Sequence, residues 1–251
     1  MVKSLGPAPP EIHEYYRNIP LRDNTPSQLK IFHNTERSNG PLFLLAFGGG
    51  FAHGTNEQLT PFSRALVRLF GGTAVNVSYR VAPEHKWPTA HHDVWDSLLW
   101  CAENAKSIGA DPAQGFILGG ISAGANITLV LSHEAQKSGL DPPLTGLWEC
   151  VPLTFRKPEH VPEKYRELWF ANEQNVEVPV LDKESVDLYH EFAEPDLDSE
   201  WYTPYAIRDV SFRGQPKTYI SVDGMDPLRD DGLIHEKVLR EQGVETRIDV
   251  W

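Results

Sequence analysis

One abrupt junction between a strand-like and a helix-like segment limits how this chain can fold more than any other feature. Residues 115–121 are a largely apolar run, 124–137 have helical spacing, and Gly120-Ile121-Ser122-Ala123-Gly124 joins the two segments without a loop. Glycines beside the serine remove the Cβ atoms that would clash in so tight a turn. The G-x-S-x-G pattern in this setting predicts a serine lifted above the end of a sheet, at the positive end of a helix.

Strand-like and helix-like patterns alternate along most of the chain. The segments 12–21 and 27–34 flank the turn-forming residues 23–26 and predict a hairpin. The other strands are expected at 42–47, 73–79, 115–121, 147–153, 217–222 and 245–251, with helices at 58–70, 89–106, 124–137 and 228–242. This order predicts an α/β fold with a mainly parallel central sheet flanked by helices, as a single domain over 1–251.

The segment 155–203 interrupts this alternation. It is polar, acidic and prone to form helices, and it lies between two predicted strands. A plain loop of about fifty residues is uncommon in a compact domain. We therefore interpret 155–203 as a helical cap inserted over the carboxyl edge of the sheet; the alternative is a long surface excursion.

Composition and charge argue against several classes of partner. A formal net charge of −12 disfavours nucleic acid and anionic membranes. No apolar run is long enough for a transmembrane helix, and residues 1–10 lack the apolar core of a secretory signal, which predicts a cytoplasmic protein. Metal-binding His or Cys pairs and nucleotide-binding glycine fingerprints are absent from the sequence, so we expect no metal and no cofactor. The sequence leaves a homodimer open.

A second glycine-rich segment follows an earlier predicted strand. Phe47-Gly48-Gly49-Gly50-Phe51 comes directly after the apolar run 42–47. Acyl transfer requires backbone N–H donors at the position where a tetrahedral oxyanion forms, and glycines let the backbone approach that position closely. The pair of glycine-rich motifs therefore indicates serine-dependent acyl chemistry.

Together with two further motifs, these segments carry a family resemblance. The stretch YRVAPEHKWP at 79–88 and the stretch DPLRD at 226–230 occur in the same order as in the hormone-sensitive-lipase-like carboxylesterases, which the chain resembles from about residue 27 onward. The resemblance implies an α/β-hydrolase fold, a Ser–Asp–His esterase and a small hydrophobic ester or metabolite as the partner. By motif, Ser122 would be the nucleophile and Asp226 the acid.

The same resemblance assigns supporting roles. Gly49, Gly50 and Ala123 would supply the N–H groups of the oxyanion hole. Phe47, Phe51 and His53, beside that loop, are candidate substrate contacts. In the stretch 79–88 we expect Arg80 and Glu84 to be paired or hydrogen-bonded beside the site.

The sequence departs from the family pattern at the histidine. The triad order places a histidine after the last strand, whereas here His235 alone follows Asp226, within the predicted helix 228–242, where a surface or packing role is expected. Phe47 and Ile121 also replace the residues usual in the family. Three explanations stay open: this chain is a shortened form of an esterase, another histidine substitutes, or the protein is a non-hydrolytic homologue such as a small-molecule binder, a dehydratase or a cyclase. His53 is the nearest substitute in sequence; His91, His92, His160 and His190 are the others.

Overall fold

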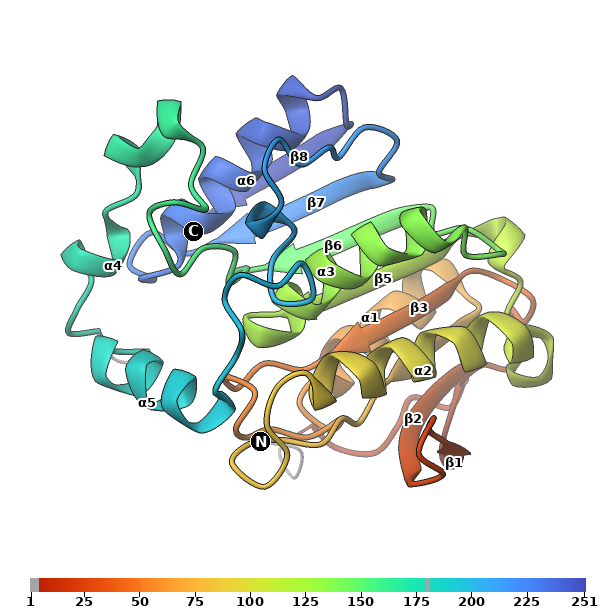
Figure 1. Cartoon of the computed structure of the whole chain (residues 1–251). Helices are drawn as coiled ribbons and strands as arrows, with labels where there is room; N and C mark the ends of the chain where they lie inside the picture. The colour runs from red at the N-terminus through yellow and green to blue at the C-terminus, as the bar shows by residue number, and fades with distance from the viewer. Residues whose placement is uncertain (1–4, 179–180) are drawn as a thin grey trace.

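The computed structural model describes residues 5–178 and 181–251, which form one eight-stranded sheet in the order β1-β2-β4-β3-β5-β6-β7-β8. All strands from β4 to β8 in this order run parallel, while β1 and β2 are antiparallel to each other and β2 to β4 (Figure 1). The strands are β1 (Ile12–Pro20), β2 (Pro26–Asn34), β3 (Leu42–Ala46), β4 (Thr73–Asn76), β5 (Phe116–Ile121), β6 (Gly146–Cys150), β7 (Lys217–Val222) and β8 (Thr246–Val250). The predicted α/β fold with a mainly parallel sheet is confirmed.

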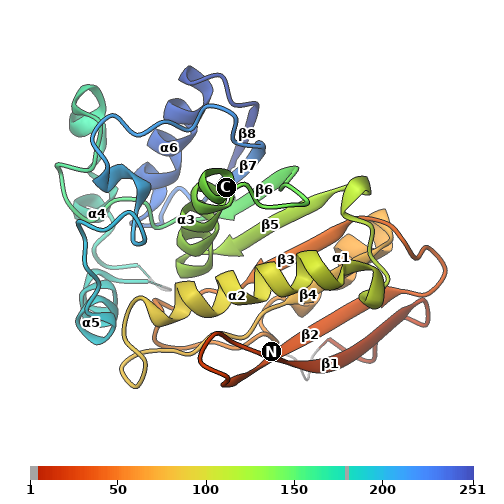
Figure 2. The same cartoon turned by 45° about the vertical axis from the view of Figure 1, so that its right-hand side comes forward.

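Helices lie on both faces of this sheet. Helices α2, α3 and α6 cover one face, and α1 lies on the opposite face (Figures 1 and 2). The α-helices are α1 (Thr60–Phe70), α2 (Thr89–Asn104), α3 (Ala123–Ser138), α4 (Ala171–Gln174), α5 (Lys183–Ala193) and α6 (Arg229–Glu241). Short 3-10 helices are η2 (Ala105–Ile108), η3 (Pro112–Gln114), η4 (Glu163–Leu168) and η5 (Pro204–Ala206).

The central strands are buried on both sides. Every residue of β3 and β4 is buried, which explains why 42–47 reads as a continuous apolar run instead of an alternating one. Two predicted strands end early. Strand β4 stops at Asn76, and β6 stops at Cys150 because Val151 has a φ of 43° and Pro152 has no N–H to donate.

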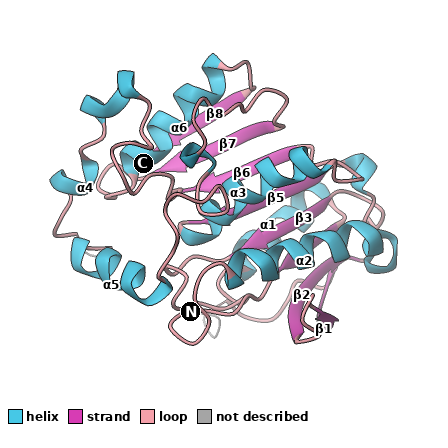
Figure 3. Cartoon of the chain, viewed as in Figure 1, coloured by secondary structure: helices cyan, strands magenta, loops and turns pink. Residues whose placement is uncertain are grey.

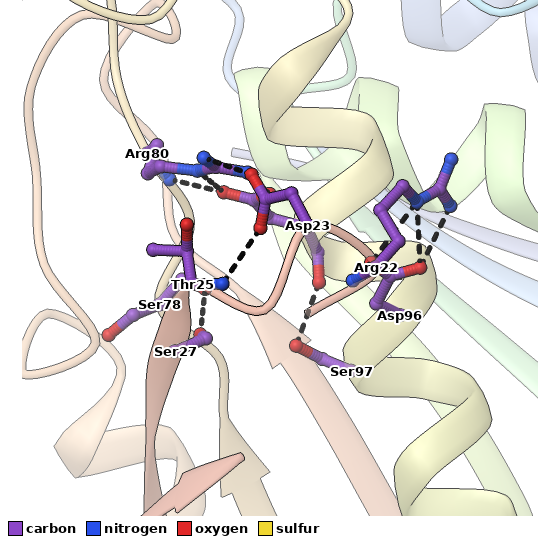
Figure 4. A network of polar contacts seen from close by, with 9 residues as sticks. Arg22, Asp23, Thr25, Ser27, Ser78, Arg80, Asp96 and Ser97 are labelled. Atoms are coloured by element: carbon purple, nitrogen blue, oxygen red, sulfur yellow. Dashed lines mark hydrogen bonds and ion pairs between the residues drawn. The ribbon is translucent and has the colours of Figure 1, made fainter. Parts of the chain in front are cut away.

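The expectation that Arg80 is paired or hydrogen-bonded is confirmed, but its partners do not include Glu84. Arg80 donates from Nη1 to Asp23 at 2.7 Å (Figure 4) and from Nη2 to Asp93 at 2.7 Å. Glu84 is exposed. The buried Asp93 on α2 presents both carboxylate oxygens to the guanidinium, so a bidentate pair forms there instead. With the Thr25 N–H, Arg80 holds the pKa of Asp23 at about 2. Arg80 thus joins the β1–β2 turn to α2.

The segment between β6 and β7 carries η4, α4 and α5, beyond the carboxyl ends of the parallel strands (Figures 1 and 3). Two acidic residues at the start of α6 anchor it. Asp231 accepts hydrogen bonds from the N–H groups of Thr154 and Phe155 and from Trp169 Nε1, and Asp230 accepts from two further backbone N–H groups in the segment. Burial raises the pKa of Asp231 to about 7. The division of the chain into one domain with a cap over 155–203, a range that includes the undescribed residues 179–180, stays a prediction.

Helix length and polarity also bear on the membrane prediction. Across residues 5–178 and 181–251, no helix combines the length and apolar character that crossing a membrane would require.

Candidate active site

Ser122 lies at a strained junction between β5 and α3. Its φ of 54° and ψ of −115° are unusual for a residue with a side chain, and such strain persists only where the surroundings fix it. The Ser122 N–H donates to the Cys150 carbonyl at 2.8 Å, and the Ser122 carbonyl accepts from the Asn126 N–H at 2.9 Å. The neighbouring strand β6 and the first turn of α3 therefore hold the serine in this conformation, as the sequence predicts.

The glycines on each side of Ser122 are required by close backbone contacts. A Cβ atom added to Gly120 would lie 2.3 Å from the carbonyl of Gly124, and one added to Gly124 would lie 2.2 Å from the Ala46 carbonyl oxygen. Both obstacles are backbone atoms, which cannot move without disturbing the sheet. The two glycines therefore let α3 start directly against the end of β3.

The triple-glycine loop lies against this junction. A Cβ atom on Gly48 would be 3.4 Å from Ser122 Cβ. The Gly48 N–H already donates to Gln58 Oε1 at 2.8 Å. Within the described chain, the N–H groups of Gly49, Gly50 and Ala123 have no protein acceptor. The loop therefore brings unused donors to the side of Ser122, an arrangement suited to an oxyanion.

A partly open cavity lies beside Ser122. Its lining is mostly apolar and comes from the glycine loop, the end of β6 and helix α5. The lining residues are Gly50, Phe51, Ser122, Leu153, Arg156, Leu181, Val186, Tyr189, His190, Ala193, Pro195, Tyr202 and Leu228. A mostly apolar cavity with a few polar groups is typical of a small-molecule site.

Of the three predicted substrate contacts, Phe51 lines this cavity, whereas Phe47 and His53 lie outside its lining. Phe47 is buried and stacks on Tyr79 with ring centroids 3.9 Å apart, because its side chain points into the core below the loop. The His53 ring packs against Tyr189, which does line the cavity, with ring centroids 5.2 Å apart.

Asp226 lies in the turn after β7. Its Oδ1 accepts a hydrogen bond from the Leu228 N–H at 2.7 Å, and the neighbouring Leu228 lines the cavity. Partial burial, with the nearby charge of Asp223, raises the pKa of Asp226. No histidine of residues 5–178 and 181–251 is hydrogen-bonded to this carboxylate.

The histidines of the chain occupy different environments. His235 is buried in α6, where Tyr205 Oη lies 2.8 Å from its Nδ1 and Glu149 Oε2 lies 3.3 Å from its Nε2. His91 is buried against Asn126 Oδ1 at 2.9 Å. His190 is the histidine in the cavity lining, where burial and then the positive charge of Arg156 lower its pKa.

The sequence did not single out Val186 and Ala193 of α5 as part of this cavity. Val186, Tyr189, His190 and Ala193 all line it, and they are spaced i, i+3, i+4 and i+7 along the helix. That spacing marks one helix face, so it was a usable signal. The spacing does not show on which surface of the protein this face of α5 packs. A Cβ atom on Gly50 would lie 2.2 Å from Tyr189 Cδ2, which shows how closely α5 packs on the glycine loop.

Known proteins share this architecture. The alpha/beta hydrolase fold family model matches residues 43–251. AB hydrolase superfamily protein B1A11.02 of Schizosaccharomyces pombe is 33% identical over all of this chain and 74% of its own length. Carboxylesterase NlhH of Mycobacterium tuberculosis is 31% identical over 84% of this chain and 64% of its own length. The crystal structure of vibralactone cyclase has a TM-score of 0.90 and 31% identity, covering 100% of this chain and 74% of that one.

These relatives are longer than the present chain, which spans 64% to 74% of the length of each of the three. The residues that match the family model nevertheless include the triple-glycine loop, the G-x-S-x-G junction at Ser122 and the turn after β7 that carries Asp226. The chain therefore belongs to the α/β-hydrolase family, among the carboxylesterases that are similar to hormone-sensitive lipase.

Proposed function

We propose that this protein hydrolyses a small hydrophobic carboxylic ester, with Ser122 as the nucleophile. The observation that carries the proposal is the setting of Ser122, between a mostly apolar cavity and the unused N–H groups of Gly49, Gly50 and Ala123. A carbonyl carbon bound beside the serine could be attacked while its oxygen accepts hydrogen bonds from these donors. Relatives that are carboxylesterases support the same reaction class.

The reaction also needs a proton acceptor, because a neutral serine hydroxyl is a poor nucleophile. His190 is the histidine that the described cavity offers for this role. Its pKa lies below the ordinary histidine value of 6.5, so the ring is neutral at pH 7 and able to accept a proton. Asp226 is the carboxylate at the edge of the site; with no histidine among its described partners to orient, its expected contribution is small and electrostatic.

Turnover of a simple ester tests the proposal. The chain should hydrolyse p-nitrophenyl butyrate and should be labelled covalently at Ser122 by a fluorophosphonate, a probe that needs an activated serine. Both signals should disappear in Ser122→Ala. Equal hydrolysis by the two proteins would contradict the assignment, since the reaction would then not depend on this hydroxyl.

A second function is favoured by one comparison and one feature of the site. Vibralactone cyclase is similar over the whole chain, and Asp226 lacks a histidine partner among the described residues. The corresponding proposal is ring closure or dehydration within a bound metabolite, or binding alone, without net hydrolysis. Under this function the chain would bind small hydrophobic metabolites yet resist fluorophosphonate labelling; rapid stoichiometric labelling of Ser122 would exclude it.

The cytoplasmic location and the assembly state also remain proposals. Cell fractionation tests the first. Light scattering of the purified chain tests whether it forms a homodimer.

A further inference from the structure

Arg156 is the one permanently charged side chain in the described lining of the cavity beside Ser122. It follows the turn after β6 and is 21% exposed, so most of its surface is shielded from solvent. The rest of the lining is apolar or neutral at pH 7, apart from the titratable His190. None of its nitrogens is both buried and unpaired in the described chain, so its five N–H donors stay available to a ligand with a matching acceptor.

The interactions of Arg156 within the described residues leave most of these donors unused. The carboxylate within ion-pair distance is Asp187 on α5, with Nη2 and Oδ1 3.5 Å apart and a side chain that is 51% exposed. The charge of Arg156 also acts on the buried Asp231. Across the described ranges, Arg156 donates no hydrogen bond. A long ion pair to a half-exposed carboxylate contributes little to stability.

Arg80 shows how this chain satisfies an arginine that has a structural role. Its Nε and Nη2 donate to the buried Asp93 at 2.9 and 2.7 Å, and its Nη1 donates to Asp23 at 2.7 Å (Figure 4). Such short, forked contacts use the planar geometry of the guanidinium fully. Arg156 has the same fork but leaves it largely unused next to the nucleophile.

We propose that Arg156 is an anion-binding subsite that selects esters carrying a second, free carboxylate. The guanidinium would receive that carboxylate in a forked pair while the ester group lies at Ser122. The mostly apolar lining would hold the carbon chain between the two groups. The inference rests on the proposed function for its ester, but ligand binding at Arg156 does not require turnover.

The test uses two probes of nearly equal shape, the monobenzyl ester of succinic acid and benzyl butyrate. They differ at one end, which is a carboxylate in the first and a methyl group in the second. Affinities are measured by calorimetry at low salt in the Ser122→Ala variant, so hydrolysis cannot interfere. We expect the anionic probe to bind at least about tenfold more tightly, because a forked Arg–carboxylate pair is a strong hydrogen-bonding contact.

Variants separate an anion site from a structural contact. Arg156→Gln should remove the preference for the anionic probe and leave benzyl butyrate within about twofold, whereas Asp187→Asn should strengthen it by removing a competing carboxylate. Arg208→Gln removes the same charge from a 97% exposed side chain outside the cavity and should change neither affinity.

Three outcomes would overturn the proposal. The probes could bind equally in the parent variant, both could fail to bind, or Arg156→Gln could weaken them equally. The last result would make Arg156 a brace for α5. Absence of ester turnover in the wild-type chain would instead contradict the proposed function and leave this binding result standing.

Discussion

Ser122 lies in the turn that follows β5, and Asp226 lies in the turn that follows β7. The two turns are built differently. Ser122 is fixed from both sides, by the Cys150 carbonyl and by the first turn of α3, and its hydroxyl faces a cavity. One carboxylate oxygen of Asp226 accepts a hydrogen bond from the N–H of Leu228, two residues later in the chain. No histidine in the described chain is hydrogen-bonded to this carboxylate. The position of Ser122 therefore depends on backbone packing, whereas the role proposed for Asp226 would require a partner from another part of the fold.

Substituting each residue should expose this difference most clearly. Ser122→Ala should lower kcat/KM for p-nitrophenyl butyrate by at least about 10³-fold, because no other group can form the acyl-enzyme. Asp226→Asn should lower it by about tenfold or less, since the carboxylate has no histidine to orient. Initial rates of the two variants at equal protein concentration provide the measurement. Equal losses would break the comparison and show that Asp226 acts through a base.

The proton acceptor gives the next largest effect. His190→Gln should lower kcat/KM by about 10²-fold or more, the usual contribution of general base catalysis. In the wild-type chain, kcat/KM should fall as the pH drops through the pKa of His190, below 6.5, because the protonated ring cannot accept a proton. A pH–rate profile tests both statements. His53→Gln is the matched control, and a larger loss there would transfer the role to His53.

The packing around the serine can be tested through stability. Gly124→Ala should lower the free energy of unfolding by about 3 kcal/mol, the upper end of the usual cost of overpacking, because the new Cβ would collide with the Ala46 carbonyl. Gly139→Ala, with no atom near its added Cβ but a φ of 71°, should cost about 1 kcal/mol. Urea denaturation measures both. Similar losses would mean that the close approach of α3 to β3 is not what requires Gly124.

The anchor beneath the β7–α6 turn gives a pH-dependent effect outside the reaction itself. The pKa of Asp231 is about 7 in the folded chain and near 3.8 when unfolded, so the folded state binds the proton more tightly. Its contribution to stability should therefore be fully present below about pH 4 and be lost as the pH rises through 7. Relative to Asp231→Asn, the melting temperature of the wild type should therefore fall as the pH rises from about 4 to above 7. A constant difference would contradict the pKa shift.

Much of the architecture was predictable because it depends on neighbours in sequence. The strand and helix segments follow from the spacing of apolar residues along the chain. The junction at Ser122 and the unused donors of the glycine loop follow from glycines, which lack a Cβ atom. The predictions fail where partners come from elsewhere. Arg80 pairs with Asp93 and Asp23 instead of Glu84, and Phe47 stacks on Tyr79 inside the core instead of lining the cavity.

By itself, therefore, the sequence determined the parallel sheet, the bend at Ser122 and the family to which the chain belongs, since each depends on local sterics or on motifs in a fixed order. Only the tertiary structure decided which side chains surround the serine. The docking of α5 on the glycine loop brings His190 and Arg156 into one cavity, although 34 positions separate them in the chain, with η4 and α4 between them. No local pattern encodes the surface on which a helix face will pack.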